Sequence, residues 1–281
     1  MTTTYSLHHI SNTAAFGFSA DDYSRFKFGD GSVSRTFGTQ LADGFIKEHL
    51  RNRHINQQIV VISSPYSFIP TATLAMKTWF VYRVNQWLAD NNLPVVQEAK
   101  VHRTITYKED YGELDAEQRM KLIGNDQFHI DKQFLTGKTL IFLDDIKITG
   151  SHERMIMKMV GEYGLDNEIY MLYFAELVNK TIHPNVENFL NYHFVKNIFS
   201  LEDIVQSAAF CINTRLVKYI LNYDHDEFCI FIEGQPGSFI EVLYNMALGN
   251  GYHTIPAYQR NLNFIKQLLF LDNYKLIQYG N

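Results

Sequence analysis

Cysteine is scarce in this chain, and positive charge is not in excess. The 281 residues contain two cysteines, Cys211 and Cys229, which are too few for a zinc cluster and lack its close C-x-x-C spacing. We expect a buried, reduced thiol at both positions. The net charge of -5 and the pI near 6.1 supply no basic field, so the composition argues against nucleic acid as a partner.

Long apolar runs are absent as well. No stretch of 18 apolar residues occurs, and the polar start MTTTYSLHHIS lacks a charged segment followed by a long apolar one. We therefore expect no membrane span, no secretory signal and a cytoplasmic location. Internal repeats and low-complexity tracts are also missing, so apolar patterns and turn signals have to define the organisation.

The composition is that of a globular protein, with 46% hydrophobic and 20% charged residues. Three regions can be distinguished. Residues 1–57 are predicted to be a lead-in packed on the core, with an amphipathic helix over residues 37–50. Residues 58–199 alternate apolar strands with helices, and residues 200–281 are predicted to be mainly helical.

The middle region predicts an α/β fold in which a parallel sheet is flanked by helices. Its strands are short, continuously apolar and separated by helical periodicity, which is typical of sheets covered on both faces. The predicted strands lie at residues 59–62, 95–107, 139–143 and 168–174, and the predicted helices lie at residues 71–89, 115–123 and 151–162.

The last region changes character. Ser200 with Asp203, and Ser238 with Glu241, resemble capping boxes at helix starts. No Gly/Ser/Pro-rich spacer precedes residue 200. We therefore expect the C-terminal helices to pack on the α/β domain, as a lid or as a surface for a protein partner or a second copy of the chain.

Residues 140–152, LIFLDDIKITGSH, carry the clearest chemical signal. Asp144 and Asp145 follow an apolar strand, and Thr149 and Gly150 lead into a helix. Ligands bind at the carboxyl ends of parallel strands, and a helix N-terminus presents N–H groups to an anion. A phosphate would lie on this backbone while the carboxylates face hydroxyl groups or Mg²⁺. The alternative is an acid pair that merely ends a strand and begins a turn.

The order of strand, acid pair, Ile146, two variable positions, Thr-Gly and helix closely resembles the phosphoribosyl pyrophosphate (PRPP) signature of the type I phosphoribosyltransferase family. Upstream, residues 102–131 resemble the segment before the signature in the ComF-type, competence-associated branch. There an arginine, a leucine, a second arginine and an aromatic strand precede the PRPP loop. The matching residues here are Arg103, Leu114, Arg119 and Phe128.

The resemblance implies a role for each part of the site. Asp144 and Asp145 would hold the ribose hydroxyls, with Mg²⁺ near them. The loop for the 5′-phosphate would consist of Lys147, Ile148, Thr149, Gly150, Ser151 and His152. The turn for the pyrophosphate would consist of Ser63, Ser64, Pro65 and Tyr66.

The upstream segment would form a mobile lid over the site. Arg103 is the candidate catalytic residue, and Tyr107, Lys108 and Arg119 are the candidate lid residues. Cations here, including Lys100, would neutralise pyrophosphate, and tyrosine rings would cover a bound base. The alternative for each cation is a solvated surface charge, and for each tyrosine a packed core edge.

The chain departs from the family pattern at several points. Ile148 stands where the family usually has a small hydroxylated residue or alanine, and His152 stands where threonine is frequent. The pyrophosphate turn lacks the glycine or arginine that many relatives use. Two cysteines are too few to bind zinc as the ComF-type zinc module does. Backbone N–H groups bind phosphate whatever the side chains, so the loop can still function.

These observations predict a protein that binds PRPP with Mg²⁺, and that transfers the phosphoribosyl group to an acceptor with release of pyrophosphate. The alternative is a non-catalytic sensor of PRPP or of a phosphorylated nucleotide, acting through the C-terminal helices. The altered phosphate loop and pyrophosphate turn favour this alternative.

Overall fold

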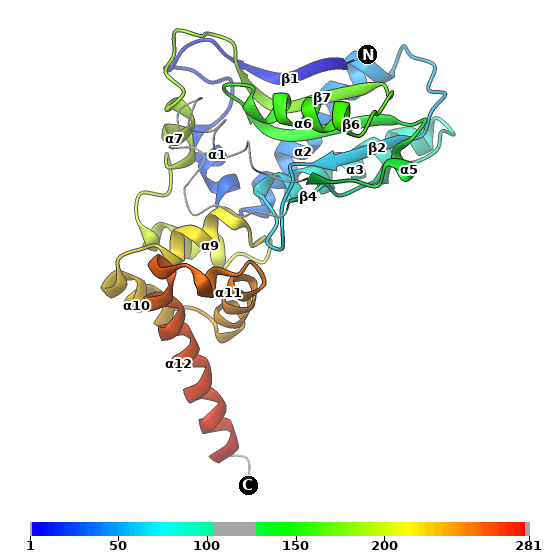
Figure 1. Cartoon of the computed structure of the whole chain (residues 1–281). Helices are drawn as coiled ribbons and strands as arrows, with labels where there is room; N and C mark the ends of the chain where they lie inside the picture. The colour runs from blue at the N-terminus through cyan, green and yellow to red at the C-terminus, as the bar shows by residue number, and fades with distance from the viewer. Residues whose placement is uncertain (1, 104–127, 279–281) are drawn as a thin grey trace.

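A computed structural model of the protein describes residues 2–103 and 128–278 (Figure 1). The chain forms a sheet covered by helices, followed by a helical region from which the last helix projects (Figure 1). Leu114, the predicted helix over residues 115–123 and the lid candidates Tyr107, Lys108 and Arg119 lie outside the described residues.

The main sheet has five parallel strands in the order β1-β7-β6-β2-β3. This confirms the predicted fold class. The central strands are almost fully buried, as their continuous apolar sequences require. The strands are β1 (Thr2–Ile10), β2 (Ile59–Ser63), β3 (Gln97–Glu98), β6 (Thr139–Lys147) and β7 (Ile169–Leu177).

Strand β1 is one of the elements that sequence reasoning missed. It begins with three threonines and pairs in parallel with β7, from Thr2 opposite Ile169 to Ile10 opposite Leu177. Thr2, Thr4 and His9 are exposed, as expected of an edge strand, so no continuous apolar run marks it. Part of the predicted lead-in therefore belongs to the sheet itself.

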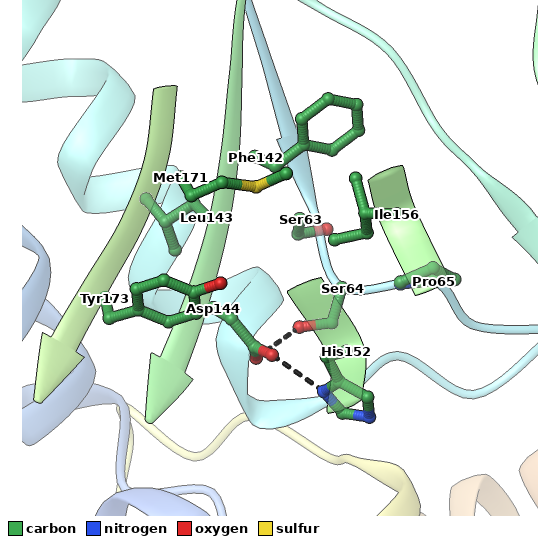
Figure 2. A pocket seen from close by; sticks show the side chains of 10 residues that line it. All are labelled: Ser63, Ser64, Pro65, Phe142, Leu143, Asp144, His152, Ile156, Met171 and Tyr173. Atoms are coloured by element: carbon green, nitrogen blue, oxygen red, sulfur yellow. Dashed lines mark hydrogen bonds and ion pairs between the residues drawn. The ribbon is translucent and has the colours of Figure 1, made fainter. Parts of the chain in front are cut away.

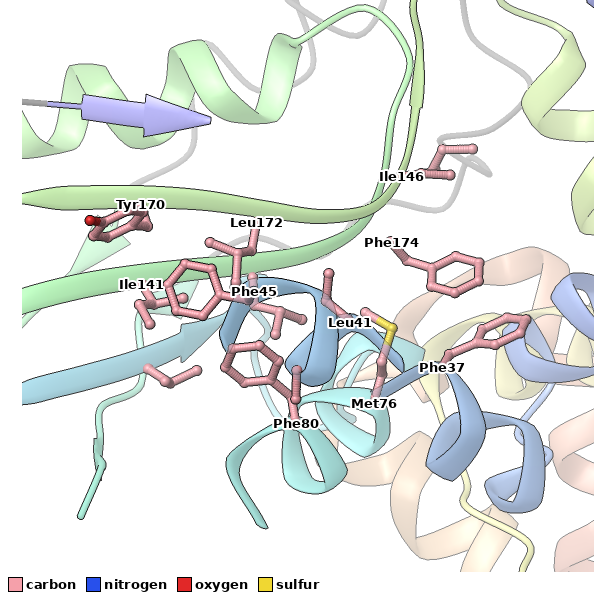
Figure 3. Packing of buried hydrophobic residues seen from close by; sticks show 14 of the residues in the cluster. Phe37, Leu41, Phe45, Met76, Phe80, Ile141, Ile146, Tyr170, Leu172 and Phe174 are labelled. Atoms are coloured by element: carbon pink, nitrogen blue, oxygen red, sulfur yellow. The ribbon is translucent and has the colours of Figure 1, made fainter. Parts of the chain in front are cut away.

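Helices cover both faces of the sheet. Strand residues alternate between the faces, so Ile141 packs in one apolar cluster and Phe142 in the other. Figure 3 shows the first cluster, in which the rings of Phe37 and Phe174 stack at 3.9 Å between centroids. The helices of this face are α1 (Ala20–Lys27), α2 (Gly31–Phe45) with the π-helical turn Ile46–Leu50, and α3 (Ala72–Asp90). The opposite face carries α5 (Lys132–Leu135) and α6 (Ser151–Glu162).

Helices α2 and α3 approach each other closely because Gly38 lies at their crossing. A Cβ atom at Gly38 would lie 2.3 Å from the backbone oxygen of Met76. A small second sheet pairs β4 (His102–Arg103) with β5 (Phe128–His129) in antiparallel fashion.

The remaining helices form a region with its own apolar core. Phe28 and Ile69, from the α/β part, are buried in that core, so the two parts share packing. Helix α7 (Val186–Asn191) precedes this region and buries Val186 and Leu190 in the large cluster of the α/β part. The elements of the region are the 3-10 turn Ile198–Leu201, α8 (Glu202–Val205), α9 (Thr214–Leu221), α10 (His225–Glu233), α11 (Gly237–Gly249), the 3-10 turn Tyr252–Thr254 and α12 (Pro256–Gln278).

Hydrogen bonds join the helical region directly to the α/β part. The Asn250 side-chain oxygen accepts from the backbone N–H groups of Phe68 and Ile69, both at 3.1 Å. The backbone N–H of Cys211 donates to the carbonyl of Gly29 at 2.9 Å. The helical region therefore packs on the α/β part without an intervening linker.

Several local predictions were wrong. The capping box predicted at Ser200 and Asp203 forms instead between Asn197 and Ser200, one turn earlier. Helix α11 begins at Gly237, with Pro236 before it, so Ser238 does not cap it. Cys211 is exposed and Cys229 is partly exposed, so neither thiol is fully buried.

No helix in the described part of the chain is long and apolar enough to cross a membrane.

Candidate functional site

The acid pair lies inside strand β6, not after it. The prediction ended this strand at residue 143, but pairing with β7 continues to Lys147 opposite Glu176. Because side chains alternate along a strand, Asp144 belongs to the face that carries α6, and Asp145 belongs to the face that carries α1 and α3. The two carboxylates therefore have different surroundings.

Asp144 is buried and accepts hydrogen bonds from both sides of the site. The Ser64 hydroxyl donates to Oδ1 at 2.6 Å, and the His152 ring nitrogen Nδ1 lies 2.9 Å from Oδ2 (Figure 2). Burial would raise the pKa of Asp144, but the hydrogen bond and positive charge of His152, with the Ser64 hydroxyl, outweigh it and hold the pKa well below its usual range. Asp144 therefore links the turn after β2 to the start of α6, the two segments predicted to bind pyrophosphate and 5′-phosphate.

Asp145 is held by helix α1. The Tyr23 hydroxyl donates to Oδ2 at 2.5 Å, and the Lys27 ammonium forms an ion pair with the same oxygen. Burial and the neighbouring Asp144 charge raise the pKa of Asp145, while Lys27 opposes them. The Thr73 hydroxyl lies 3.3 Å from an oxygen of each aspartate and so bridges the pair.

Tyr23 and Lys27 are site residues that sequence reasoning missed. They lie four residues apart on one face of α1, and Tyr23 is fully buried. Burial, and then the Asp145 charge, raise the pKa of the Tyr23 hydroxyl well above its usual value, so it stays protonated as a donor. Sequence patterns did not single out these two residues, because tyrosine and lysine are common on amphipathic helices that have no role in a site.

The predicted phosphate loop is a turn between β6 and α6. Gly150 occupies the position before the first residue of α6 with φ of 70°, a conformation that strains other residues. The Thr149 and Ser151 hydroxyls lie 2.8 Å apart. Arg154 donates to the Thr149 carbonyl at 2.9 Å and to the Ser151 hydroxyl at 3.0 Å. Arg154 is a cation at the loop that sequence reasoning did not select.

Two loop side chains point into the protein. The Lys147 ammonium pairs with Glu153 at 2.8 Å and with Glu176 at 3.1 Å. Burial lowers the pKa of Lys147, but these two carboxylates outweigh it and raise the pKa. Ile148 packs against the large apolar cluster. The side chains at these two positions are therefore already engaged within the protein.

The predicted pyrophosphate turn begins with Ser63, the last residue of β2, and contacts the acid pair through Ser64. Ser63 and Ser64 are buried, whereas Pro65 and Tyr66 are partly exposed. The three residues 63–65, with Asp144 and His152, line a cavity of about 10 Å³, which is room for roughly one water molecule (Figure 2). The structure thus brings together residues that are 80 positions apart in sequence.

Lys100 lies at the same turn. Its ammonium donates to the carbonyl of Ser67 at 2.9 Å and stands 3.9 Å from the centre of the Tyr66 ring. Burial lowers the pKa of Lys100. This cation borders the turn from the segment between β3 and β4.

Arg103 belongs to β4, where it pairs with Phe128 of β5. A cavity of about 460 Å³ lies beside these strands, and its polar lining includes Lys100, His102, His129 and Asp131. Among the described residues, no group of three or more His, Cys, Asp or Glu side chains could hold a metal ion.

The described structure is an α/β protein with a parallel sheet, a tight turn that joins β6 to α6 and a helical C-terminal region. A family profile described as "PRTase ComF-like" matches residues 1–265. The chain therefore belongs to the ComF-like phosphoribosyltransferase family. A search of curated proteins found no match.

Solved structures that resemble the chain include hypoxanthine phosphoribosyltransferases. A Staphylococcus aureus enzyme shares 9% identity over 53% of this chain and 75% of its own, with a TM-score of 0.33. A Leishmania donovani hypoxanthine-guanine enzyme shares 8% sequence identity over 52% of this chain and 73% of its own, with a TM-score of 0.32. A mutant Trypanosoma cruzi enzyme, in a ternary complex with substrates, shares 14% sequence identity over 53% of this chain and 79% of its own, with a TM-score of 0.32. Likeness at this level carries no argument about function.

Proposed function

We propose that the protein binds PRPP with Mg²⁺ and transfers its phosphoribosyl group to an acceptor, with release of pyrophosphate. Membership of the phosphoribosyltransferase family supports this class of activity. The observation that carries the proposal is the hydrogen-bonded set of Ser64, Asp144 and His152. It joins the three parts that a PRPP site needs, a pyrophosphate turn, a ribose carboxylate and a phosphate loop, at one edge of the sheet.

The 5′-phosphate is proposed to lie on the loop of residues 147–152. The first turn of α6 leaves backbone N–H groups without helical partners, and the helix dipole favours an anion there. Gly150 sets the loop backbone, and Arg154 lies beside it. A guanidinium group matches phosphate oxygens in geometry as well as in charge.

The ribose hydroxyls are proposed to bind Asp144 and Asp145. Asp144 borders the small cavity, and a hydroxyl there would take the place of His152 or Ser64 as donor. Asp145 keeps Oδ2 on Lys27 and Tyr23, while its Oδ1 lies 3.3 Å from the Thr73 hydroxyl. Oδ1 is thus the oxygen that Asp145 would offer.

The pyrophosphate is proposed to lie at the turn of residues 63–66, with Lys100 beside it. Mg²⁺ binds through one or two carboxylates and substrate phosphates, and a buried carboxylate that borders a cavity, as Asp144 does, fits this donor set. When bound, the ion would neutralise charge on the departing pyrophosphate.

The chemistry asked of the protein is mainly positional. A transition state with oxocarbenium character needs the sugar held in place, the leaving group neutralised and water excluded. Arg103, Tyr107, Lys108 and Arg119 remain predicted for the catalytic and lid roles. None of the residues described above is required as a covalent nucleophile.

The test is pyrophosphate release from PRPP and Mg²⁺ across a panel of nucleobases and other amine acceptors, combined with calorimetric PRPP binding. Gly150→Ala should weaken PRPP binding at least tenfold, about 1.4 kcal/mol, because the loop backbone must shift. Gly137→Ala is the matched control. Gly137 also has positive φ, with no atom near its Cβ position, and it lies outside the site. Equal PRPP affinity in both variants would contradict the loop assignment.

A second candidate is a sensor that binds PRPP without turnover. It is favoured by the partners that both signature carboxylates already have, His152 for Asp144 and Lys27 for Asp145. PRPP binding at micromolar affinity with no pyrophosphate release for any acceptor would support this candidate. Turnover with a single acceptor would exclude it.

A further inference from the structure

The cavity of about 460 Å³ beside β4 and β5 is separate from the small cavity of Figure 2, and its size is within the range of small-molecule pockets. Its apolar lining includes Ile62, Val101 and Leu135, which are almost fully buried. Phe134 adds an aromatic ring to this lining, and the Lys138 ammonium stands 3.5 Å from the centre of that ring. The cavity can therefore hold the apolar body of a ligand.

Nitrogen donors line the same cavity. His102 and His129 are directly paired across β4 and β5, so their side chains project from the same face of this small sheet, and both residues are exposed. Lys100 also lines the cavity, and its ammonium donates to the carbonyl of Ser67. Within residues 2–103 and 128–278, no carboxylate pairs with any of these three basic side chains.

The carboxylates of the lining are engaged elsewhere. Glu98 forms an ion pair with Lys77 of α3. Asp131 accepts from the backbone N–H of Phe134 at 2.9 Å and so caps α5. The basic groups left to a ligand are one ammonium and two imidazoles, and each of them can donate an N–H. This set of donors suits an anion.

We propose that the cavity binds a small aromatic carboxylate, with its carboxylate on Lys100, His102 and His129 and its ring against the apolar lining. Lys100 brings one fixed positive charge, which matches the single charge of a carboxylate, whereas a phosphate dianion would also face the nearby Asp131 carboxylate. A charge-assisted hydrogen bond to a carboxylate is stronger than the present bond of Lys100 to a backbone carbonyl. The inference goes beyond the proposed function, and its test needs no PRPP.

The experiment uses the full-length protein and three probes in NMR titrations at constant ionic strength. Benzoate has the ring and the charge, benzamide keeps the ring without the charge, and acetate keeps the charge without the ring. The variants are Lys100→Met, the double variant His102→Ala with His129→Ala, and Ala99→Phe, which fills the cavity and keeps the three donors. His253→Ala is the matched control, because His253 is an exposed histidine of the helical region and does not line the cavity. Thermal unfolding of each variant reports on the fold, and Ala99→Leu replaces Ala99→Phe if that variant unfolds.

We expect wild-type protein to bind benzoate at least tenfold more tightly than benzamide or acetate. Lys100→Met, the double histidine variant and Ala99→Phe should each weaken benzoate binding at least tenfold, and His253→Ala should not change it. Equal affinity for benzoate and benzamide would overturn the inference, as would wild-type benzoate affinity in Lys100→Met or in Ala99→Phe. Wild-type protein that binds PRPP but not benzoate would overturn the inference and leave the proposed function intact.

Discussion

The two signature aspartates should respond differently to the same substitution. Changing Asp to Asn keeps the shape of the side chain and removes its charge. Asp144 has an imidazole as its ionisable partner, whereas Asp145 has the ammonium of Lys27. The side chain of His152 is 36% exposed and that of Lys27 is 12% exposed. Solvent can therefore compensate for the lost carboxylate charge far better at Asp144 than at Asp145.

The expected stability losses follow from these exposures. Asp144→Asn keeps the Ser64 hydrogen bond to an amide oxygen and loses a partly exposed ion pair, which costs about 1 kcal/mol or less. Asp145→Asn leaves Lys27 buried without its counter-ion, and removal of one partner from a buried pair costs roughly 3 kcal/mol. Adding Lys27→Met to Asp145→Asn should recover much of that loss, because it removes the unpaired charge.

PRPP binding should weaken in both variants. Loss of a charged acceptor for a ribose hydroxyl costs about 1.4 kcal/mol, or tenfold in affinity. Urea unfolding at pH 7 gives the stability, and calorimetry with Mg²⁺ gives the affinity. Asp166→Asn is the control, because Asp166 is an exposed carboxylate in the turn before β7. This turn lies at the amino ends of the strands, away from the acid pair at the carboxyl end of β6.

Two results would refute the reasoning. Asp144→Asn with wild-type PRPP affinity would show that this carboxylate does not contact the ribose. Asp145→Asn as stable as Asp166→Asn would show that the Lys27 ion pair does not hold helix α1 on the sheet.

Three further predictions concern other parts of the molecule. The pKa of Asp144 is depressed in the folded protein, so the ionised carboxylate stabilises the fold above pH ~4, and this contribution is lost as the pH falls through the folded pKa. The difference in unfolding free energy between wild type and Asp144→Asn should therefore shrink as the pH falls below ~4. A difference that stays constant across a series of unfolding measurements at acid pH would contradict this. Gly38→Ala should cost at least about 2 kcal/mol because its Cβ meets the α3 backbone, whereas Gly161→Ala on α6, with open space around it, should gain roughly 0.5 kcal/mol in urea unfolding. A chain that ends at Ser200 should aggregate because it exposes Phe28, and a soluble fragment with a cooperative melt would contradict the shared core.

The elements that the sequence predicted well are those whose signal is local. Strand β2, helix α3 and helix α6 combine an apolar pattern with a clear turn at one end, and their observed bounds lie within one residue of the predicted ones. The turn between β6 and α6 was also predictable, since Thr149 and Gly150 stand between an apolar strand and a helical pattern; its role as a phosphate loop stays a prediction.

The elements that were missed depend on contacts between distant residues. Strand β1 is polar at its start and becomes a strand because β7 offers it a free edge. Likewise, Tyr23 and Lys27 acquire their role only when α1 packs against the end of β6, 118 residues away from Lys27. Sequence patterns report which face of a helix is buried, but they do not report what lies opposite it.

Charge balance in the folded protein limits where affinity for PRPP can come from. Asp144 and Asp145 each have a basic partner, and the ammonium of Lys147 is neutralised by two glutamates. A bound phosphate therefore gains little from Lys147, in spite of its place in the signature.

If the protein binds PRPP as proposed, the attraction would come instead from the backbone N–H groups of residues 147–152 and from cations such as Lys100 and Arg154, whose described hydrogen bonds go to carbonyl and hydroxyl oxygens. A cation that leaves a carbonyl or hydroxyl oxygen to bind a phosphate oxygen loses less free energy than a cation that leaves a carboxylate. Replacing Lys147 by Met should accordingly change PRPP affinity less than replacing Arg154 by Met. The reverse order in calorimetric titrations would show that the two glutamates release Lys147 to the ligand.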